Sequence, residues 1–379
     1  MPSRFIEASA AEQIPVFRSS LSAASIDRAT RVMESGWLGQ GEEVRAFEAA
    51  LGERLGARNC VAVSSGTAAL HLALACLDLA VGAEVVTTPI TWIATHHAIH
   101  YVGARPVLAD IDPTTGNVDP ASVAELVSER TGALLAVHYS GYPCDLSELA
   151  DIADRHGIPL VEDAAQAFGA EYRGAPIGSR DNLQTLSFGP TKNLTTIHGG
   201  AVITGDDRQA DRLRALRALG QGHGTSERLR REGSSYRSGY VMGEVGYRYD
   251  MADVHAAVGL GQLGVVDEEN RRRAEIAAAY AHGLAGVEGI EPVRREAERT
   301  SSNHFFPALV ERRDELAVAL RDRGVDTSVH YPLNPLVRAP AGTIPNAEHF
   351  ARRTLTLPLH ASLQNHEMDR VLEAIAAGW

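Results

Sequence analysis

Cysteine is scarce in this chain, which holds only three in 379 residues. Cys60, Cys76 and Cys144 lie far apart and form no C-x-x-C pair, which excludes a disulfide framework and a cysteine zinc site. We therefore expect the three thiols to be reduced and packed. No run approaches the roughly 18 apolar residues that span a bilayer. The first residues, MPSRFIEASAAEQIPVF, have no apolar signal-peptide core, so we expect a cytoplasmic protein without a membrane partner.

An excess of positive charge is absent as well. The 36 lysines and arginines are outnumbered by 48 acidic residues, which gives a net charge of -12 and no basic surface for DNA or RNA. The short basic runs 228–231 and 271–273 are typical of solvated faces. We therefore expect no nucleic-acid partner. Apolar residues make up 44% and charged residues 22%, which is the composition of a globular protein.

Metal-ligand spacing is also missing. His96 and His100 form an i, i+4 pair on an expected helix, and His97 lies between them, but no acidic third ligand follows in register. We predict no metal site.

Between residues 59 and 162, short apolar runs alternate with segments of helical spacing. This alternation predicts right-handed crossovers and an α/β fold, with a mostly parallel sheet covered on both faces. Ligands of such sheets bind at the carboxyl ends of the strands. The expected strands are 59–63, 84–88, 106–109, 133–137 and 159–162, and the expected helices are 69–77, 92–101, 120–128 and 146–155.

The segments that flank 59–162 have a different pattern of apolar residues. Helical spacing over 22–56 breaks at 36–39, and a new alternation late in the chain predicts a smaller α+β domain. We place a large domain at 1–255 and a small C-terminal domain at 256–379. The other expected elements are helices 210–219, 252–267, 269–284, 313–323, 347–355 and 366–377, strands 183–188, 201–204, 303–310 and 327–330, and a long loop at 221–243.

A single lysine stands out in the stretch LQTLSFGPTKNLTTIHGG. Lys192 follows the end of strand 183–188 at Gly189-Pro190 and precedes strand 201–204. Burial beside apolar strands lowers the pKa of a lysine and frees the lone pair that covalent chemistry at a carbonyl needs. Taken alone, a lysine in a loop is more often a solvent-facing residue.

Polar residues also follow three neighbouring strands. Ser64-Ser65-Gly66-Thr67 leads into a helix N-terminus, which is an anion site, although serine and threonine there are also ordinary N-caps. Asp163 ends strand 159–162 and needs a cation partner if it is buried, or else it caps a helix. His138 and Tyr139 end another strand, where they face a pocket or cap the strand. Trp92 begins a helix, where its ring stacks on a flat heterocycle or packs in the core.

Several of these segments together resemble the DegT/DnrJ/EryC1/StrS aminotransferases. That family consists of fold type I enzymes that use pyridoxal 5'-phosphate (PLP), and it is best known for aminating keto sugars attached to nucleotides. The resemblance covers nearly the whole chain. It lies in SSGTAAL (64–70), TWIAT (91–95), HYSGYPCD (138–145), EDAAQAFGA (162–170), SFGPTKNL (187–194), GYRYDMADVHAAVGLGQL (246–263), VDTSVHYPLNPL (325–336) and TLPLH (356–360).

The resemblance implies a role for each site residue. Lys192 would hold the cofactor aldehyde as a Schiff base and then shuttle a proton, and Asp163 would keep the pyridine nitrogen protonated. Gln166 would bond the ring hydroxyl, and Trp92 would stack on the ring. The phosphate would be held by Ser65, Gly66, Thr67 and Ser187.

Two segments depart from the family pattern. Relatives place an asparagine within 246–250 that reaches the partner subunit's phosphate, whereas this chain has Arg248 and Asp250 there. Arg248 could replace that contact by charge. The resemblance thus implies a homodimer with shared active sites. His198 stands where an acid is usual, and with His138, Tyr139 and His330 it is expected near the substrate.

By this resemblance the chain would move an amino group from an amino acid, L-glutamate in our prediction, to a nucleotide-linked keto sugar. Pyridoxamine 5'-phosphate (PMP) would carry the group between the half-reactions. A keto-cyclitol acceptor and a PLP- or PMP-dependent sugar dehydratase remain alternatives, although such dehydratases carry histidine in place of Lys192. A PLP-binding regulator is a further alternative, usually with a fused DNA-binding domain. The arginines 228, 230, 231 and 237 in the long loop would contact a diphosphate or belong to a solvated flap.

Overall fold

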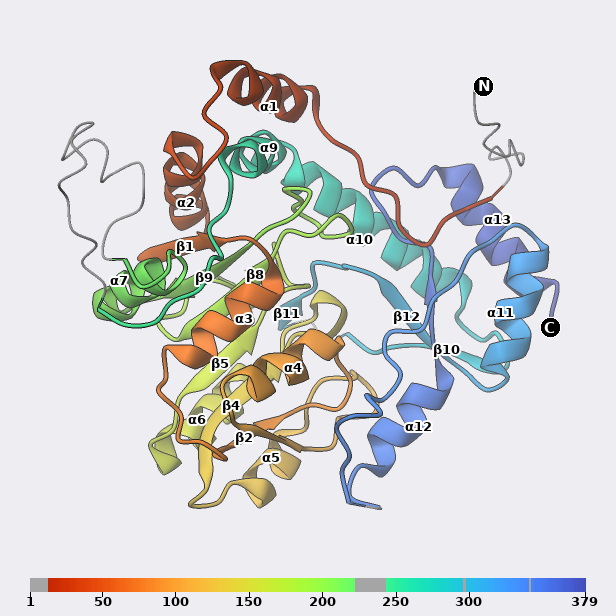
Figure 1. Cartoon of the computed structure of the whole chain (residues 1–379). Coiled ribbons are helices and arrows are strands. Elements are labelled where there is room, and N and C mark those ends of the chain that lie inside the picture. The colour runs from red at the N-terminus through yellow and green to blue at the C-terminus, as the bar shows by residue number, and fades with distance from the viewer. Residues whose placement is uncertain (1–12, 222–242, 296–297, 341) are drawn as a thin grey trace, which may run out of the picture.

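A seven-stranded sheet lies at the centre of the structure (Figure 1). The computed structural model describes residues 13–221, 243–295, 298–340 and 342–379. In spatial order the strands are β1 (Asn59–Val63), β9 (Gly200–Thr204), β8 (Leu183–Ser187), β5 (Leu160–Asp163), β4 (Thr131–Val137), β2 (Glu84–Thr87) and β3 (Arg105–Leu108). The sheet confirms the predicted α/β architecture.

All neighbouring pairs in this sheet are parallel except those of β9, which runs antiparallel to both β1 and β8. Residues 188–199 join β8 to β9 without a helix, and β9 returns beside β8 as its antiparallel neighbour. The carboxyl ends of β1, β4, β5 and β8 therefore meet at one edge of the sheet. The predicted polar segments come together there.

Helices cover both faces of the sheet because side chains of each strand point alternately to two cores. Val61 and Val63 pack with α3 (Gly66–Ala75), α4 (Ile93–Tyr101) and α7 (Asp207–Leu216). Cys60 and Ala62 pack into the opposite cluster. The helices on that second face are α2 (Glu42–Leu55), α5 (Pro120–Leu126), α6 (Leu146–His156) and α9 (Asp253–Leu263). The three cysteines are free and buried, as expected.

Local signals explain several helix boundaries. Ser22 caps α1 (Ala23–Ser35) by accepting a hydrogen bond from the Ser25 backbone N–H, and Gly36 ends that helix in the left-handed region. Helix α1 then packs against α9, where Ser25 Oγ donates to the Val258 carbonyl at 2.9 Å. The division at residue 255 stays a prediction.

A smaller antiparallel sheet lies to one side of the large sheet (Figure 1). Its strands are β10 (Ile290–Pro292), β12 (Phe306–Val310) and β13 (Thr354–Leu357). Its core is shared with the long helix α10 (Val266–Gly283), as Ile276 and Tyr280 show. The helices packed around it are α11 (Arg313–Asp322), α12 (Pro345–Arg353) and α13 (Asn365–Ala376). A third sheet consists of β11 (Arg299–Thr300), β6 (Glu171–Tyr172) and β7 (Ala175–Pro176).

Two expected elements need correction. The predicted strand 327–330 is a single bridge between Ser328 and Thr356, because the chain turns away toward the large sheet at His330. The predicted helix 347–355 ends at Arg353, because Thr354 begins the edge strand that pairs with β12. The predicted loop at 221–243, with its arginines, falls almost wholly outside the described residues.

Candidate active site

A cavity of about 480 Å³ opens at the carboxyl edge of the large sheet. Its walls come from α3 and α4, from the ends of β5 and β8, and from the segment that follows α11. Most of the residues predicted for the site line this one cavity, which agrees with the rule for ligands of parallel sheets. They are Ser65, Gly66, Thr67, Trp92, Asp163, Gln166, Ser187, Lys192, His198 and His330.

One end of the cavity is suited to an anion. Ser65 Oγ accepts the Ala68 backbone N–H at 3.1 Å, so the N–H groups of Gly66 and Thr67 are the first donors of α3 without an intrahelical acceptor. Gly66 lies against Ser187, and a Cβ at Gly66 would be 2.6 Å from Ser187 Cβ. Only glycine allows this approach, which leaves a hollow with backbone and hydroxyl donors.

Asp163 occupies the middle of the cavity wall. Its carboxylate accepts a hydrogen bond from Thr95 Oγ1 at 2.8 Å and from the Ala165 backbone N–H at 3.1 Å. Burial raises the pKa of Asp163, whereas these hydrogen bonds and the charge of Lys192 oppose the rise. A buried carboxylate held by two donors is a suitable partner for a cationic ring N–H.

Lys192 lies in the turn after β8, where its backbone N–H donates to the Gly189 carbonyl at 3.1 Å. Burial lowers the pKa of Lys192 to about 8, and the Asp163 carboxylate opposes the shift. At neutral pH the side chain therefore carries a sizeable fraction of neutral amine. The interpretation of Lys192 as a solvent-facing loop residue is wrong.

Gln166 and Trp92 lie on the remaining walls. Gln166 Oε1 accepts the Ser140 backbone N–H at 2.7 Å, and its Nε2 donates to the Tyr331 hydroxyl at 3.0 Å. One amide hydrogen is thus left for a ligand. Trp92 is 58% exposed, with its ring 6.1 Å from that of Tyr331, so its alternative role in core packing is excluded.

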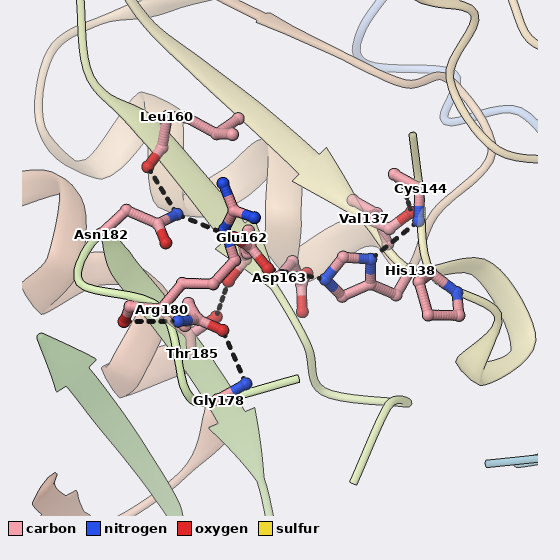
Figure 2. Close-up of polar contacts among 12 residues, drawn as sticks. Val137, His138, Cys144, Leu160, Glu162, Asp163, Gly178, Arg180, Asn182 and Thr185 are labelled. Carbon is pink, nitrogen blue, oxygen red and sulfur yellow. Dashed lines mark hydrogen bonds and ion pairs between the residues drawn. The ribbon is translucent and has the colours of Figure 1, made fainter. Parts of the chain in front are cut away.

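His138 and Tyr139 lie outside the cavity, which corrects the expectation that they face a substrate. His138 is fully buried between the Cys144 backbone N–H and Glu162 Oε2, each 3.1 Å away (Figure 2). Tyr139 is also buried, and its hydroxyl donates to the His330 carbonyl at 2.5 Å. The reason is that the chain turns back into the core through the short 3-10 segment Tyr139–Gly141 directly after β4.

Glu162 and Asp163 face opposite sides of the sheet because side chains alternate along β5. Glu162 accepts a hydrogen bond from Asn182 Nδ2 at 2.9 Å, and Arg180 lies 3.7 Å away (Figure 2). Of the two acids at this strand end, only Asp163 reaches the cavity.

Arg248 and Asp250 also lie outside this cavity. The Ser64 backbone N–H donates to the Tyr249 carbonyl at 2.7 Å, which aligns the segment with the end of β1. Tyr247 and Tyr249 pack against the helix layer, so the alternating Arg248 and Asp250 point outward. Both line a separate hollow of about 230 Å³ beside Trp37, Leu38, Gly39 and Gln40.

The sequence alone did not indicate four further lining residues, Phe17, Thr95, His304 and Tyr331. Phe17 belongs to an extended N-terminal segment, and His304 precedes β12 in a stretch that reads as an apolar strand. Phe17 and His304 reach the cavity from distant parts of the chain, whereas Thr95 and Tyr331 lie close in sequence to the predicted Trp92 and His330.

These groups fit PLP as the resemblance implies. The hollow at Gly66 has donors for a phosphate, Asp163 offers a buried carboxylate for a ring N–H, and Lys192 presents an amine of lowered pKa. Within the described ranges, no group of three or more histidine, cysteine or acidic residues could hold a metal ion. In the same part of the chain, no helix is long and apolar enough to cross a membrane.

Comparison with known proteins agrees with this chemistry. A model of the DegT/DnrJ/EryC1/StrS aminotransferase family matches residues 19–376. Spore coat polysaccharide biosynthesis protein SpsC of Bacillus subtilis is 36% identical over 364 residues, 92% of this chain and 93% of that protein. The crystal structure of sugar aminotransferase CalS13 from Micromonospora echinospora is 37% identical with a TM-score of 0.89, covering 97% of this chain and 100% of that chain.

A further similar structure is Spr1654 of Streptococcus pneumoniae, solved in an apo form, a PMP form and a PLP form. Its PLP form is 27% identical with a TM-score of 0.88, covering 96% of this chain and 98% of that chain.

Proposed function

Because the chain belongs to the DegT/DnrJ/EryC1/StrS aminotransferase family, we propose that it transfers an amino group from L-glutamate to a nucleotide-linked keto sugar. The chain is a PLP-dependent aminotransferase of fold type I, with PMP as the second form of its cofactor. The printed names of CalS13, a sugar aminotransferase, and SpsC, a polysaccharide biosynthesis protein, support a sugar acceptor in amino-sugar or secondary-metabolite biosynthesis. A cytoplasmic location stays a prediction.

The observation that carries the proposal is the convergence of Lys192, Asp163 and the N-terminus of α3 in one cavity. Bound PLP supplies an electrophilic carbon and a ring that accepts electrons. Lys192 Nζ would anchor the cofactor and, when free of it, would move a proton at the reacting carbon. Asp163 keeps the ring nitrogen protonated. The N–H groups of Gly66 and Thr67 bind the phosphate.

The remaining cavity residues position the cofactor and substrate. Ser65 and Ser187 have hydroxyl hydrogens within the same hollow as the phosphate donors, and the free amide hydrogen of Gln166 would bind the ring hydroxyl. Trp92 would cover one face of the ring at the mouth of the cavity. His198 and His330 would lie next to the substrate, since both line the same cavity as Lys192.

A sugar dehydratase of the same family is the second candidate. A lysine at position 192 favours amine transfer, since the family's dehydratases typically lack the Schiff-base lysine. A keto-cyclitol acceptor would need the same cavity and differs only in the substrate. A regulator that binds PLP without turnover is a third candidate, and it predicts cofactor binding with no reaction of any amino donor.

We further propose a homodimer in which the segment of Arg248 and Asp250 contributes to the partner's cavity. The outward direction of both side chains supports this arrangement. Trp37 and Leu38, beside them, are 41% and 55% exposed, and this adjacent apolar pair would be covered in such a dimer.

The test is a panel of keto-sugar nucleotides and keto-cyclitols, each incubated with the purified protein and with glutamate or glutamine. We expect mass spectrometry to detect an aminated sugar nucleotide with glutamate. We expect Lys192→Ala to lose this product and the visible absorbance band of the PLP enzyme. A deoxygenated product would identify a dehydratase, and full activity of Lys192→Ala would contradict the assigned role of the lysine.

A further inference from the structure

His304 is a buried histidine that faces the reactive lysine. Its Nε2 lies 3.5 Å from Lys192 Nζ, and the side chain lines the cavity while the residue is only 4% exposed. The imidazole stacks on Phe17, with ring centroids 5.9 Å apart, and contacts the edge of Phe305 at 5.5 Å. Packing on two aromatic rings fixes its plane.

The other ring nitrogen of His304, Nδ1, contacts the side-chain amide of Asn193, which in turn is hydrogen-bonded to the amide of Asn270. The orientation of each amide is fixed by its other hydrogen bonds. Asn270 Nδ2 donates to the Phe168 carbonyl at 3.1 Å, and a carbonyl can only accept. Asn270 Oδ1 therefore faces the other way and accepts from Asn193 Nδ2 at 2.7 Å and from Arg273 at 3.3 Å. The orientation of the Asn270 amide is thus determined by the backbone.

The orientation of the Asn193 amide is also determined by a backbone carbonyl. Its Nδ2 donates to the Ser302 carbonyl at 2.7 Å as well as to Asn270, so its Oδ1 must be the atom that faces His304 Nδ1 at 3.1 Å. An amide oxygen accepts only, so Nδ1 carries the hydrogen. A neutral imidazole has one N–H, which leaves a lone pair on Nε2 directed at Lys192.

Gly169 makes this chain of amides sterically possible. A Cβ at Gly169 would lie 2.3 Å from Asn270 Nδ2, and the residue has φ +87, a conformation that other residues rarely adopt. A glycine is therefore required at position 169, because Asn270 approaches the backbone closely there.

We propose that His304 is a positioning residue, which accepts a hydrogen bond from Lys192 Nζ through Nε2 and is held in that tautomer by Asn193 and Asn270. The inference rests on the proposed role of Lys192. When the lysine is free of the cofactor, this contact directs its amine. An acceptor lone pair stabilises the ammonium form more than the amine, so His304 opposes the lowering of the Lys192 pKa by burial.

Asp163, His198, His330 and Arg273 are titratable groups that line cavities together with Lys192. Asp163 is the anion that faces it, and its charge raises the pKa of Lys192. His330 is neutral, since burial and the lysine charge lower its pKa to about 4. Arg273 contacts the far side of Asn270 and lies 3.7 Å from Glu269. Burial lowers the pKa of His304 well below its usual range, which agrees with the neutral tautomer.

The test measures the titration of Lys192 in cofactor-free protein, by the pH dependence of its acylation followed by peptide mass spectrometry. His304→Phe removes the acceptor and should lower the pKa of Lys192 by about one pH unit. His304→Gln retains an acceptor oxygen, so its Lys192 should titrate like that of the wild type. His71→Phe is the control, because His71 is a buried histidine that packs against Tyr249, away from Lys192.

Each result decides the proposal. The proposal is overturned if Lys192 of His304→Phe titrates with the pKa of the wild type. It is also overturned if the pKa of Lys192 falls equally in His304→Phe and His304→Gln. An equal fall in His71→Phe also overturns it, since that result indicates general loosening of the fold. Should His304→Phe fail to fold, Asn193→Leu replaces it, because loss of the Asn193 oxygen releases the tautomer and should lower the Lys192 pKa. Labelling needs no turnover, so its outcome is separate from that of the Lys192→Ala assay.

Discussion

At the scale of residues, the proposed chemistry depends on an acid and an amine that line the same cavity. Burial favours the neutral forms of both Asp163 and Lys192, and each charge partly restores that of the other. The hydrogen bonds from Thr95 and Ala165 favour the carboxylate, and the Asp163 charge and the lone pair of His304 favour the ammonium form of Lys192. Burial outweighs these interactions for both groups, so the pKa of Asp163 is raised and that of Lys192 is lowered to about 8.

The pH dependence of cofactor incorporation follows from this balance. With a pKa of about 8, roughly a tenth of Lys192 is neutral at pH 7, against fewer than about one in a thousand for an ordinary lysine. The rate at which cofactor-free protein incorporates PLP should therefore rise about tenfold per pH unit up to about pH 8 and then level. Stopped-flow absorbance measures this rate.

Asp163→Asn is the comparison for this measurement. The carboxylate raises the pKa of Lys192, so its removal should move the midpoint of the pH profile to lower pH. Titration of PLP itself is common to both proteins and does not alter the difference between them. A midpoint near pH 10 in the wild type, or an upward shift in Asp163→Asn, would contradict the assigned electrostatics.

At the scale of elements, the N-terminus of α3 is the part of the fold that we propose binds the cofactor phosphate. The helix has ten residues, Ser65 caps it, and its first two N–H groups open into the hollow beside Ser187 at the end of β8. Strand β8 and helix α3 pack in contact, and the absence of a side chain at Gly66 lets them approach. The proposed phosphate site therefore depends on the packing of these two elements.

Gly66→Ala tests that packing. The added Cβ would meet Ser187 Cβ at 2.6 Å, so the helix end or the serine must shift. Loss of one charge-assisted hydrogen bond costs about 1.5–3 kcal/mol, which predicts that the dissociation constant of PLP rises roughly ten- to a hundredfold. Absorbance titration measures the constant. Gly264→Ala is the matched control, because a Cβ there would make an ordinary contact of 3.5 Å with the Gly261 carbonyl and should leave PLP binding unchanged.

At the scale of the whole molecule, the cavity of Lys192 and the hollow of Arg248 indicate how two copies would cooperate in the proposed dimer. Each subunit has the cavity with Lys192 and, elsewhere on its surface, the hollow of Arg248, Asp250 and the exposed Trp37 and Leu38. If the hollow of one copy faces the cavity of the other, each active site needs both subunits. This arrangement makes a prediction that a single variant cannot test.

The expected result is complementation between two inactive variants. Lys192→Ala and Arg248→Glu should each lose activity, but a mixed dimer should contain one site with wild-type lysine and wild-type arginine. Random exchange of equal amounts should therefore restore about a quarter of the wild-type activity. Activity after co-refolding, with the mass from light scattering, checks this. Absence of restoration in confirmed mixed dimers would place Arg248 outside the partner's site.

Much of the fold and of the site was determined by local sequence. The alternation of apolar strands and helices over 59–162 depends on patterns of period 2 and 3.6, which act over a few residues, so the elements lie where they were expected. The positions of Lys192 after β8 and of Asp163 at the end of β5 follow from strand ends and the rule for parallel sheets.

Only the tertiary structure decided which polar side chains face the cavity. His138 and Asp163 both end parallel strands, yet the turn after β4 buries His138 against Glu162. His304 comes within 3.5 Å of Lys192 although 112 residues separate them in the chain, and no local pattern encodes such a contact. The direction of Arg248 depends likewise on the packing of its neighbouring tyrosines. The physical reason is that local sequence determines periodicity and strand ends, whereas the direction of a side chain depends on contacts between distant segments.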